Sequence, residues 1–156
     1  MLNVLFLCTG NSCRSIMAEA LLNKLGKNRF HSFSAGSFPA GTVHPISLTT
    51  LERHHIPARG YSSKSWDIFK DLTEFHLVIT VCDNAAGEVC PLFPGSPVKI
   101  HWPTPDPAHF KGTDAEILDE FDRVYGILEN RIKALIFLQV DRLRDNALKE
   151  AVSHII

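Results

Sequence analysis

The residues of this chain whose types and spacing point to chemistry are four cysteines and one arginine. Cys8 and Arg14 enclose five residues, in the pattern C-x-x-x-x-x-R. A loop of this length can curl so that successive backbone N–H groups converge on one point. Arg14 adds a planar fork that fits two oxygens of a tetrahedral oxyanion. We therefore expect an oxyanion-binding loop made of Thr9, Gly10, Asn11, Ser12, Cys13, Arg14 and Ser15.

The same loop predicts a reactive thiol at Cys8. Arg14 and the positive end of the following helix are expected to lower the pKa of this thiol and favour the nucleophilic thiolate. Gly10 and Asn11 are the residues best able to adopt the left-handed conformations that a tight curl needs. Ser15 is expected to donate a hydrogen bond to the thiolate. The alternative interpretation is that Cys8 is a small buried residue at the end of a strand.

Cys82 and Cys90 form a second pair of thiols, with seven residues between them. Cys82 ends a predicted strand, and parallel strands bring their C-terminal ends to one edge of a sheet, so Cys82 is expected near Cys8. Structural zinc sites have about two to four residues between paired ligands, and no histidine completes a ligand pattern here. We expect no metal. A redox relay is favoured over two inert buried thiols, and Cys13 is interpreted as a packing residue.

Asp106 lies between two prolines, Pro105 and Pro107. Such a loop can hold a carboxyl group rigidly over an anion, where a protonated Asp106 would donate its proton to a departing oxygen as general acid. The alternative is that Asp before Pro is ordinary turn chemistry. His101 and Trp102 are interpreted as packing beneath this loop.

Apolar runs and helical stripes predict the elements that position these residues. Strands are expected at 2–7, 30–34, 77–81 and 98–101, and helices at 15–25, 45–54, 114–138 and towards the C-terminus, where Leu143, Leu148, Val152 and Ile155 share a stripe. Gly26 is expected to end the first helix and Thr113 to cap the long one, while Gly126 is expected to bend or interrupt it.

This alternation of strands and helices predicts the fold class. We expect a single three-layer α/β domain, in which a parallel four-stranded sheet is flanked by helices. The length of 156 residues and the 45% of apolar residues suit one domain with one core.

The overall charge limits the class of partner. Sixteen basic and seventeen acidic residues leave a net charge of −1, so no basic field exists to hold nucleic acid, and an anionic partner must be small and locally bound. No apolar run approaches the roughly 20 residues of a membrane span. Four clustered cysteines do not form a disulfide scaffold, which favours a cytoplasmic protein.

The motifs resemble, in order, those of the arsenate reductases built on the low-molecular-weight protein tyrosine phosphatase fold. The resemblance covers roughly residues 2–138, which predicts a phosphatase-like domain at 1–138 with 139–156 as a C-terminal helical extension of it. The matching segments are Leu5-Phe6-Leu7-Cys8-Thr9-Gly10-Asn11-Ser12-Cys13-Arg14-Ser15, Met17-Ala18-Glu19-Ala20, Ser34-Ala35-Gly36, Val81-Cys82-Asp83, Cys90-Pro91, His101-Trp102 and Asp106-Pro107.

The resemblance implies reduction of arsenate to arsenite by a relay of three thiols, for arsenic detoxification. Cys8 attacks arsenate, Cys82 resolves the adduct, and Cys90 carries the disulfide to an external thiol reductant. This donor is thioredoxin, or glutaredoxin with glutathione, and no cofactor is bound. Thioredoxin-coupled members often have six residues between the last two cysteines, whereas this chain has seven, so the donor stays open.

The resemblance also implies a potassium site near the loop in some members. Asn11 and Ser34 match the residues expected there, but Lys64 stands where an Asp is expected. A Lys64 ammonium would replace the cation, and activity would then not depend on potassium. The alternative is a solvated surface lysine.

Two other functions remain open. A protein tyrosine phosphatase that hydrolyses phosphate monoesters would use the same loop, Arg14 and Asp106. It would need no Cys82–Cys90 relay, and phosphatases of this fold usually display aromatic residues after the Asp-Pro, where this chain has Ala108-His109-Phe110. A non-catalytic oxyanion or redox sensor is the second alternative, against which the presence of both Arg14 and Asp106 favours turnover.

Overall fold

Four parallel strands form the central sheet of this computed structural model, which describes residues 1–71, 74–82 and 93–155. The spatial order is β2-β1-β3-β4, so β1 is paired on both sides. An apolar segment with neighbours on both edges and both faces is typical of a buried parallel strand. The predicted parallel four-stranded sheet is confirmed, with strands at β1 (Leu2–Cys8), β2 (Phe30–Gly36), β3 (Leu77–Thr80) and β4 (Val98–His101).

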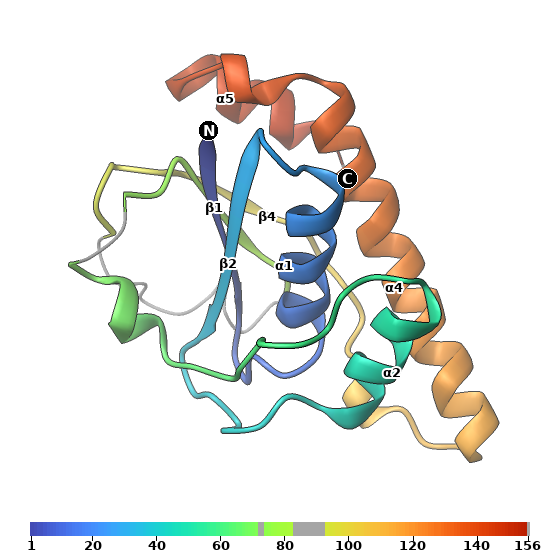
Figure 1. Cartoon of the computed structure of the whole chain (residues 1–156). Helices are drawn as coiled ribbons and strands as arrows, with labels where there is room; N and C mark the ends of the chain where they lie inside the picture. The colour runs from blue at the N-terminus through green and yellow to red at the C-terminus, as the bar shows by residue number, and fades with distance from the viewer. Residues whose placement is uncertain (72–73, 83–92, 156) are drawn as a thin grey trace.

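The helices lie around this sheet in a single α/β domain (Figure 1). Helices α1 (Arg14–Leu25) and α4 (Asp114–Phe137) pack together, and α2 (Pro45–Arg53) packs on both of them. Helix α5 (Asp145–Ser153) contacts β4 and lies near the end of the sheet where β1 begins. The C-terminal ends of β1, β3 and β4 are therefore at the opposite end, away from α5.

The two faces of β2 show how the sheet is covered. Ser34 donates a hydrogen bond to Glu19 of α1, so this side chain lies on the α1 face. Successive side chains of a strand alternate, which places Phe33 on the other face. There it packs edge-on against Phe69 and Phe75, with ring centroids 5.6 and 5.5 Å away. Phe69 ends the 3-10 helix η1 (Trp66–Phe69).

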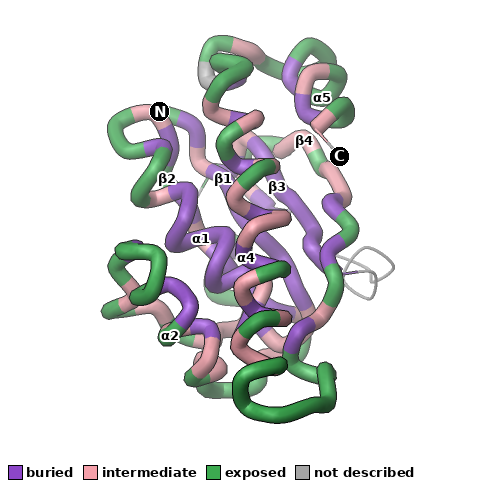
Figure 2. The backbone as a smooth tube through the Cα atoms, turned by 90° about the vertical axis from the view of Figure 1, so that its right-hand side faces the viewer, coloured by how far each residue is buried: buried purple, intermediate pink, exposed green. Residues whose placement is uncertain are grey.

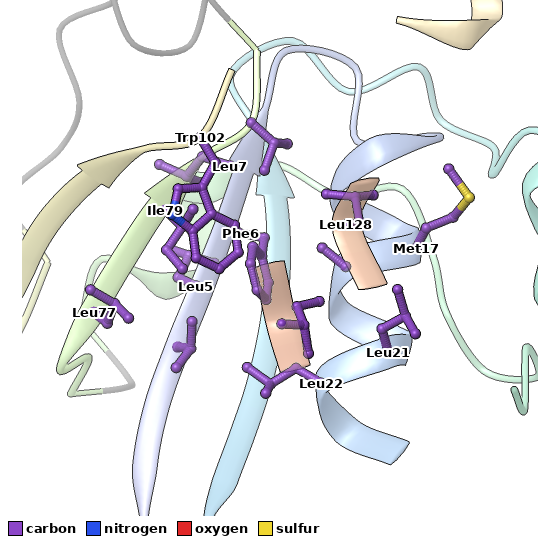
Figure 3. Packing of buried hydrophobic residues seen from close by; sticks show 14 of the residues in the cluster. Leu5, Phe6, Leu7, Met17, Leu21, Leu22, Leu77, Ile79, Trp102 and Leu128 are labelled. Atoms are coloured by element: carbon purple, nitrogen blue, oxygen red, sulfur yellow. The ribbon is translucent and has the colours of Figure 1, made fainter. Parts of the chain in front are cut away.

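The core runs between β1 and α1 (Figure 3). Phe6, Met17 and Leu21 are completely buried, and Figure 2 shows buried residues along β1, β3 and α1. Trp102 is also completely buried, with its ring centroid 6.1 Å from that of Phe6. Its predicted packing role is confirmed. The last part of the chain contributes Val140, Leu148 and Val152 to the same buried cluster, whereas the division at residue 138 stays a prediction.

The predicted ends of the helices are largely confirmed. Gly26 is the C-cap of α1, and its amide donates to Leu22 O. Thr113 caps α4 through a full capping box with Glu116. The sequence predicts a bend or an interruption of the helix at Gly126; the interruption is wrong, because α4 is continuous from residue 114 to residue 137, and a bend there stays a prediction. None of the helices in the described ranges is long and apolar enough to cross a membrane.

Replacing Gly126 with alanine should stabilise the protein. A Cβ built at this position meets no atom within 4 Å, and alanine costs less conformational entropy than glycine in a helix. We expect a gain of about 0.5–1 kcal/mol in the free energy of unfolding, measured by urea denaturation.

Gly26→Ala is the matched control, because a Cβ there would lie 2.8 Å from the Phe30 ring and 2.9 Å from Leu22 O. This variant should lose stability. A Gly126→Ala variant that is less stable than the natural chain would contradict the account of α4.

Candidate active site

A pocket of about 310 Å³ opens at the C-terminal ends of β1 and β3. It brings together nearly all the residues that the sequence predicts to act, although they come from three distant segments of the chain. Of the predicted residues, Ser15 does not line the pocket, and Cys90 lies outside the described residues. The lining consists of Cys8, Thr9, Gly10, Asn11, Ser12, Cys13, Arg14, Cys82, Asp106, Ala108 and His109.

The loop between β1 and α1 turns its carbonyl groups outwards. Backbone amides of the segment 38–44 donate to three of them over 2.9 to 3.1 Å, namely Phe38 to Thr9 O, Ala40 to Gly10 O and His44 to Ser12 O. The C=O and the following N–H of a planar trans peptide point in opposite directions. The amides that follow these carbonyls therefore point into the pocket, as an oxyanion cradle requires.

The side chain of Asn11 holds this curl from beneath. Asn11 has a positive φ of 48° and is completely buried. Its Nδ2 donates to Ser15 Oγ at 2.8 Å and to Ser34 Oγ at 2.9 Å, and its Oδ1 accepts from the amide of Lys64 at 2.9 Å. The predicted left-handed residue of the loop is thus fixed by three hydrogen bonds to three other segments.

The close approach of β2 also shapes the loop. A Cβ on Gly36 would lie 2.3 Å from Thr9 O, so no larger residue fits here unless the loop moves. The amide of Gly36 donates to Lys64 O at 2.9 Å, and Ser63 Oγ donates to Gly10 O at 3.0 Å. Residues 63–64 therefore support the loop from the side of β2.

An ion pair between buried Glu19 and half-buried Lys64 lies next to Asn11. Lys64 Nζ is 3.6 Å from Glu19 Oε1 and donates to Ser34 Oγ at 3.3 Å and to Ser62 O at 2.8 Å. Burial raises the pKa of Glu19, an effect that Lys64 opposes. Burial likewise lowers the pKa of Lys64. Lys64 is not the solvated lysine of the alternative interpretation, because only 19% of its side chain is exposed. That it replaces a potassium ion stays a prediction.

Arg14 lies at the rim of the cradle, with only 12% of its side chain exposed. Its Nη1 donates to Thr104 O at 3.0 Å, and its Nη2 lies 3.3 Å from Asp106 Oδ2. Its buried Nε has no hydrogen-bond partner within the described parts of the chain. A buried donor without an acceptor is costly, and an oxyanion in the cradle would satisfy it.

Cys8 and Cys82 are in direct contact on the pocket floor, as their positions at two strand ends predict. Their thiols hydrogen-bond to each other, and Cys82 Sγ also accepts from the amide of Thr9 at 3.3 Å. This contact corrects the predicted reactivity of Cys8. The hydrogen bond with Cys82 and burial raise the pKa of the Cys8 thiol, and this outweighs the lowering caused by Arg14.

Two other residues of the loop, Ser15 and Cys13, are expected to play different roles from the reacting thiols. Ser15 Oγ accepts from Asn11, a different contact from the predicted donation to Cys8. Cys13 is buried at the start of α1, and burial raises the pKa of its thiol. Both observations fit structural roles for these residues. In the described residues, no group of three or more His, Cys, Asp or Glu side chains could hold a metal ion.

Three supporting residues were not singled out from the sequence as members of the site. Glu19 is an acidic residue within the apolar stripe of α1, a signal that indicates a buried charge with a partner. His109 lines the pocket three residues after Asp106, a spacing that brings side chains together in a 3-10 turn. Ser63 left no comparable signal, because its role depends on where the segment after α2 lies in the fold.

A model of one protein family matches residues 3–152, and its description is low molecular weight phosphotyrosine protein phosphatase. The chain belongs to this family. The predicted fold class is thereby confirmed.

Several relatives of the chain are named as arsenate reductases. The chain is 38% identical over 130 residues to an arsenate reductase of Halalkalibacterium halodurans, covering 83% of this chain and 91% of the relative. A solved structure described as an arsenate reductase in the phosphate binding state has a TM-score of 0.72 and 29% identity, covering 88% and 98% of the two chains. A thioredoxin-dependent arsenate reductase of Corynebacterium glutamicum has a TM-score of 0.57 and 29% identity, covering 85% and 62%.

Replacing Lys64 with methionine should leave the Glu19 carboxylate buried without its cation. We expect a loss of about 2–4 kcal/mol in the free energy of unfolding near neutral pH. The raised pKa of Glu19 means that the folded state holds a proton that the unfolded state has released. The free energy of unfolding therefore falls as pH rises from the ordinary carboxyl pKa to the raised pKa of Glu19. In the variant the pKa of Glu19 is higher still, so the free energy of unfolding should fall further over this pH range.

The double variant Lys64→Met/Glu19→Gln provides the control, since it removes both charges. Urea unfolding at a series of pH values should show the added pH dependence in the single variant and not in the double one. The same pH dependence in both variants would contradict the ion-pair assignment.

Proposed function

We propose that this protein is an arsenate reductase that works through a relay of Cys8, Cys82 and Cys90. The observation that carries this proposal is the direct contact of the Cys82 thiol with Cys8 on the floor of an oxyanion cradle. Hydrolysis of a phosphate ester does not require a second thiol next to the nucleophile. Reduction of a bound oxyanion requires one, because two thiols supply the two electrons.

The cradle suits arsenate by its geometry and charge. The inward amides of the loop and the guanidinium of Arg14 supply donors to several oxygens of one tetrahedral anion. The start of α1 adds the positive end of a helix dipole. The anion is bound by local groups, so the near-neutral charge of the whole chain is no obstacle.

The first step joins Cys8 to arsenic. The Cys8 thiol must first lose its proton, which Arg14 and the Thr9 amide favour and which the neighbouring Cys82 opposes. The sulfur then bonds to arsenic, one arsenic–oxygen bond breaks, and the oxygen leaves as water after receiving a proton from Asp106. No electrons are transferred to arsenic in this step.

The second step reduces arsenic. The Cys82 thiol gives up its proton to an arsenic oxygen, and its sulfur attacks the Cys8 sulfur. A disulfide forms, and the sulfur–arsenic bond breaks with its electron pair left on arsenic. Arsenic passes from the +5 to the +3 state and leaves as arsenite, while two thiols become one disulfide. The contact between the two sulfurs means that this attack needs little movement.

Burial explains why a third thiol is needed. Cys8 and Cys82 are only 5% and 4% exposed, so a disulfide between them is out of reach of a protein reductant. In the proposed third step Cys90 attacks Cys82 and releases Cys8 as a thiol, which leaves a Cys82–Cys90 disulfide. Since Cys90 lies outside the described residues, this step rests on the sequence.

An external thiol donor completes the cycle. The name of the Corynebacterium glutamicum relative supports thioredoxin as this donor, while glutaredoxin with glutathione is the alternative that the sequence leaves open. Such donors keep thiols reduced in the cytoplasm, and we place the reaction there. The proposed enzyme binds no cofactor.

Purified protein supplied with arsenate, thioredoxin, its reductase and NADPH should produce arsenite at many turnovers per enzyme. Glutaredoxin with glutathione in the same assay should support less. Cys8→Ser should abolish arsenite formation, because the first bond to arsenic is lost. Cys13→Ser is the matched control on the same loop and should keep most of the activity. Absence of arsenite with both donor systems would overturn the proposed function.

Cys90→Ser separates reductase from phosphatase. A reductase that lacks its third thiol should release about one arsenite per enzyme and then stop, because the buried disulfide is not reduced. A phosphatase would hydrolyse an aryl phosphate at an unchanged rate in the same variant. Continued arsenite formation by Cys90→Ser would contradict the relay.

A further inference from the structure

Asp106 has three partners that share its two oxygens. Oδ1 accepts from the amide of Ala108 at 2.9 Å. Oδ2 lies 3.3 Å from Arg14 Nη2 and also 3.3 Å from His109 Nε2. The oxygen that faces the pocket is thus placed between a guanidinium and an imidazole.

The local backbone puts His109 at this place. Asp106 is the N-cap of the 3-10 helix η2 (Pro107–His109), and residues three apart lie above one another in such a turn. Arg131 donates to Pro103 O at 2.6 Å and to Thr104 Oγ1 at 3.1 Å, which holds the preceding segment against α4. The His109 side chain is 88% exposed and also lines the pocket. It therefore connects Asp106 with solvent.

Two demands on this part of the site conflict. The proposed general acid must carry a proton, whereas a guanidinium next to a carboxyl group generally favours the carboxylate. The guanidinium group of Arg14 must also bind the oxyanion. When an oxyanion takes the Arg14 donors, Asp106 retains His109 as its partner on Oδ2.

We propose that His109 is a positioning residue that acts through Asp106 and supplies the proton that Asp106 gives to the departing oxygen. This inference rests on the role of Asp106 in the proposed function. The Nε2 proton of an imidazolium passes to Asp106 Oδ2, which leaves a neutral imidazole and a neutral carboxyl group. Asp106 then passes that proton to the departing oxygen, and the exposed imidazole takes another from solvent. Imidazole side chains titrate in the pH range in which enzymes work, which suits such a relay.

Oxyanion binding should therefore be linked to proton uptake. Among the described residues, the charged and titratable groups that line the pocket with Asp106 and His109 are Arg14 and the thiols of Cys8, Cys13 and Cys82. Arg131 of α4 contacts the segment that precedes Asp106. An anion that neutralises Arg14 favours the protonated form of the Asp106–His109 pair, so anion affinity should fall as pH rises.

Calorimetric titration with sulfate tests this link without any turnover. Sulfate stays a dianion over the whole range of the experiment, so it neither takes up nor releases protons itself. The starting protein carries Cys8→Ser, which removes the titration of the nucleophile. Binding heats in two buffers of different ionisation enthalpy give the number of protons taken up per sulfate, between about pH 5.5 and 8.

The Cys8→Ser protein should take up about half a proton per sulfate near the middle of this range. Adding His109→Gln should at least halve the uptake and flatten the fall of affinity with pH. His154→Gln, at the C-cap of α5 and remote from the pocket, should behave like the Cys8→Ser protein. Equal uptake with and without His109 would overturn the inference and leave the proposed function standing. Failure of sulfate to bind would overturn the oxyanion cradle, and with it both proposals.

Turnover supplies a second readout. In the otherwise natural chain, His109→Ala should lower kcat for arsenate about tenfold with little change in KM. Added imidazole should restore part of the lost rate, whereas a merely structural loss would not respond. His109→Ala with an unchanged kcat would contradict the relay through Asp106.

Discussion

The hydrogen bonds of the Asn11 side chain are the interaction on which the rest of the site depends. They fix a non-glycine residue at a positive φ and connect the loop to α1, to β2 and to the segment that contains Lys64. A buried amide without partners would cost about 1–3 kcal/mol for each unmet group. Because its three bonds are made, the loop keeps the curl that turns its amides inwards, and α1 begins where Arg14 can reach the pocket.

The Lys64–Glu19 pair explains how this arrangement is held in a protein of near-neutral charge. A buried ion pair contributes little net stability, since desolvation offsets much of the attraction. Its contribution here is geometric, because Ser34 bonds Glu19, Lys64 and Asn11 together. The positive charge that binds an anion comes from Arg14 at the rim of the loop, so the site does not require a basic surface.

The sequence was sufficient for the parts of the fold that depend on local pattern. Apolar runs and helical stripes predict the strands and helices, and the order of the motifs places Cys8, Cys82 and Asp106 at one edge of the sheet. Prediction from the sequence failed where contacts between distant segments determine the structure. Gly126 does not interrupt α4, which is continuous from residue 114 to residue 137 and packs against α1 and α2. The sequence predicts that Cys82 lies near Cys8, but not that the two thiols hydrogen-bond, and this hydrogen bond together with burial raises the pKa of Cys8.

The contact between Cys8 and Cys82 has two opposite effects, and both follow from proximity. It makes the first thiol harder to ionise, and it places the second thiol ready to attack the first. An isolated nucleophile would be more reactive as a phosphatase, whereas a pair of neighbouring sulfurs suits a two-electron reduction. In the proposed relay, His109 supplies a proton to Asp106 and takes no part in the thiol chemistry.

Disulfide mapping of the Cys90→Ser variant after one addition of arsenate tests this central claim most directly. Peptide mass spectrometry should find one disulfide, between Cys8 and Cys82, in an amount equal to the arsenite released. A variant in which Cys8 stays reduced, or is paired with Cys13, would contradict the account.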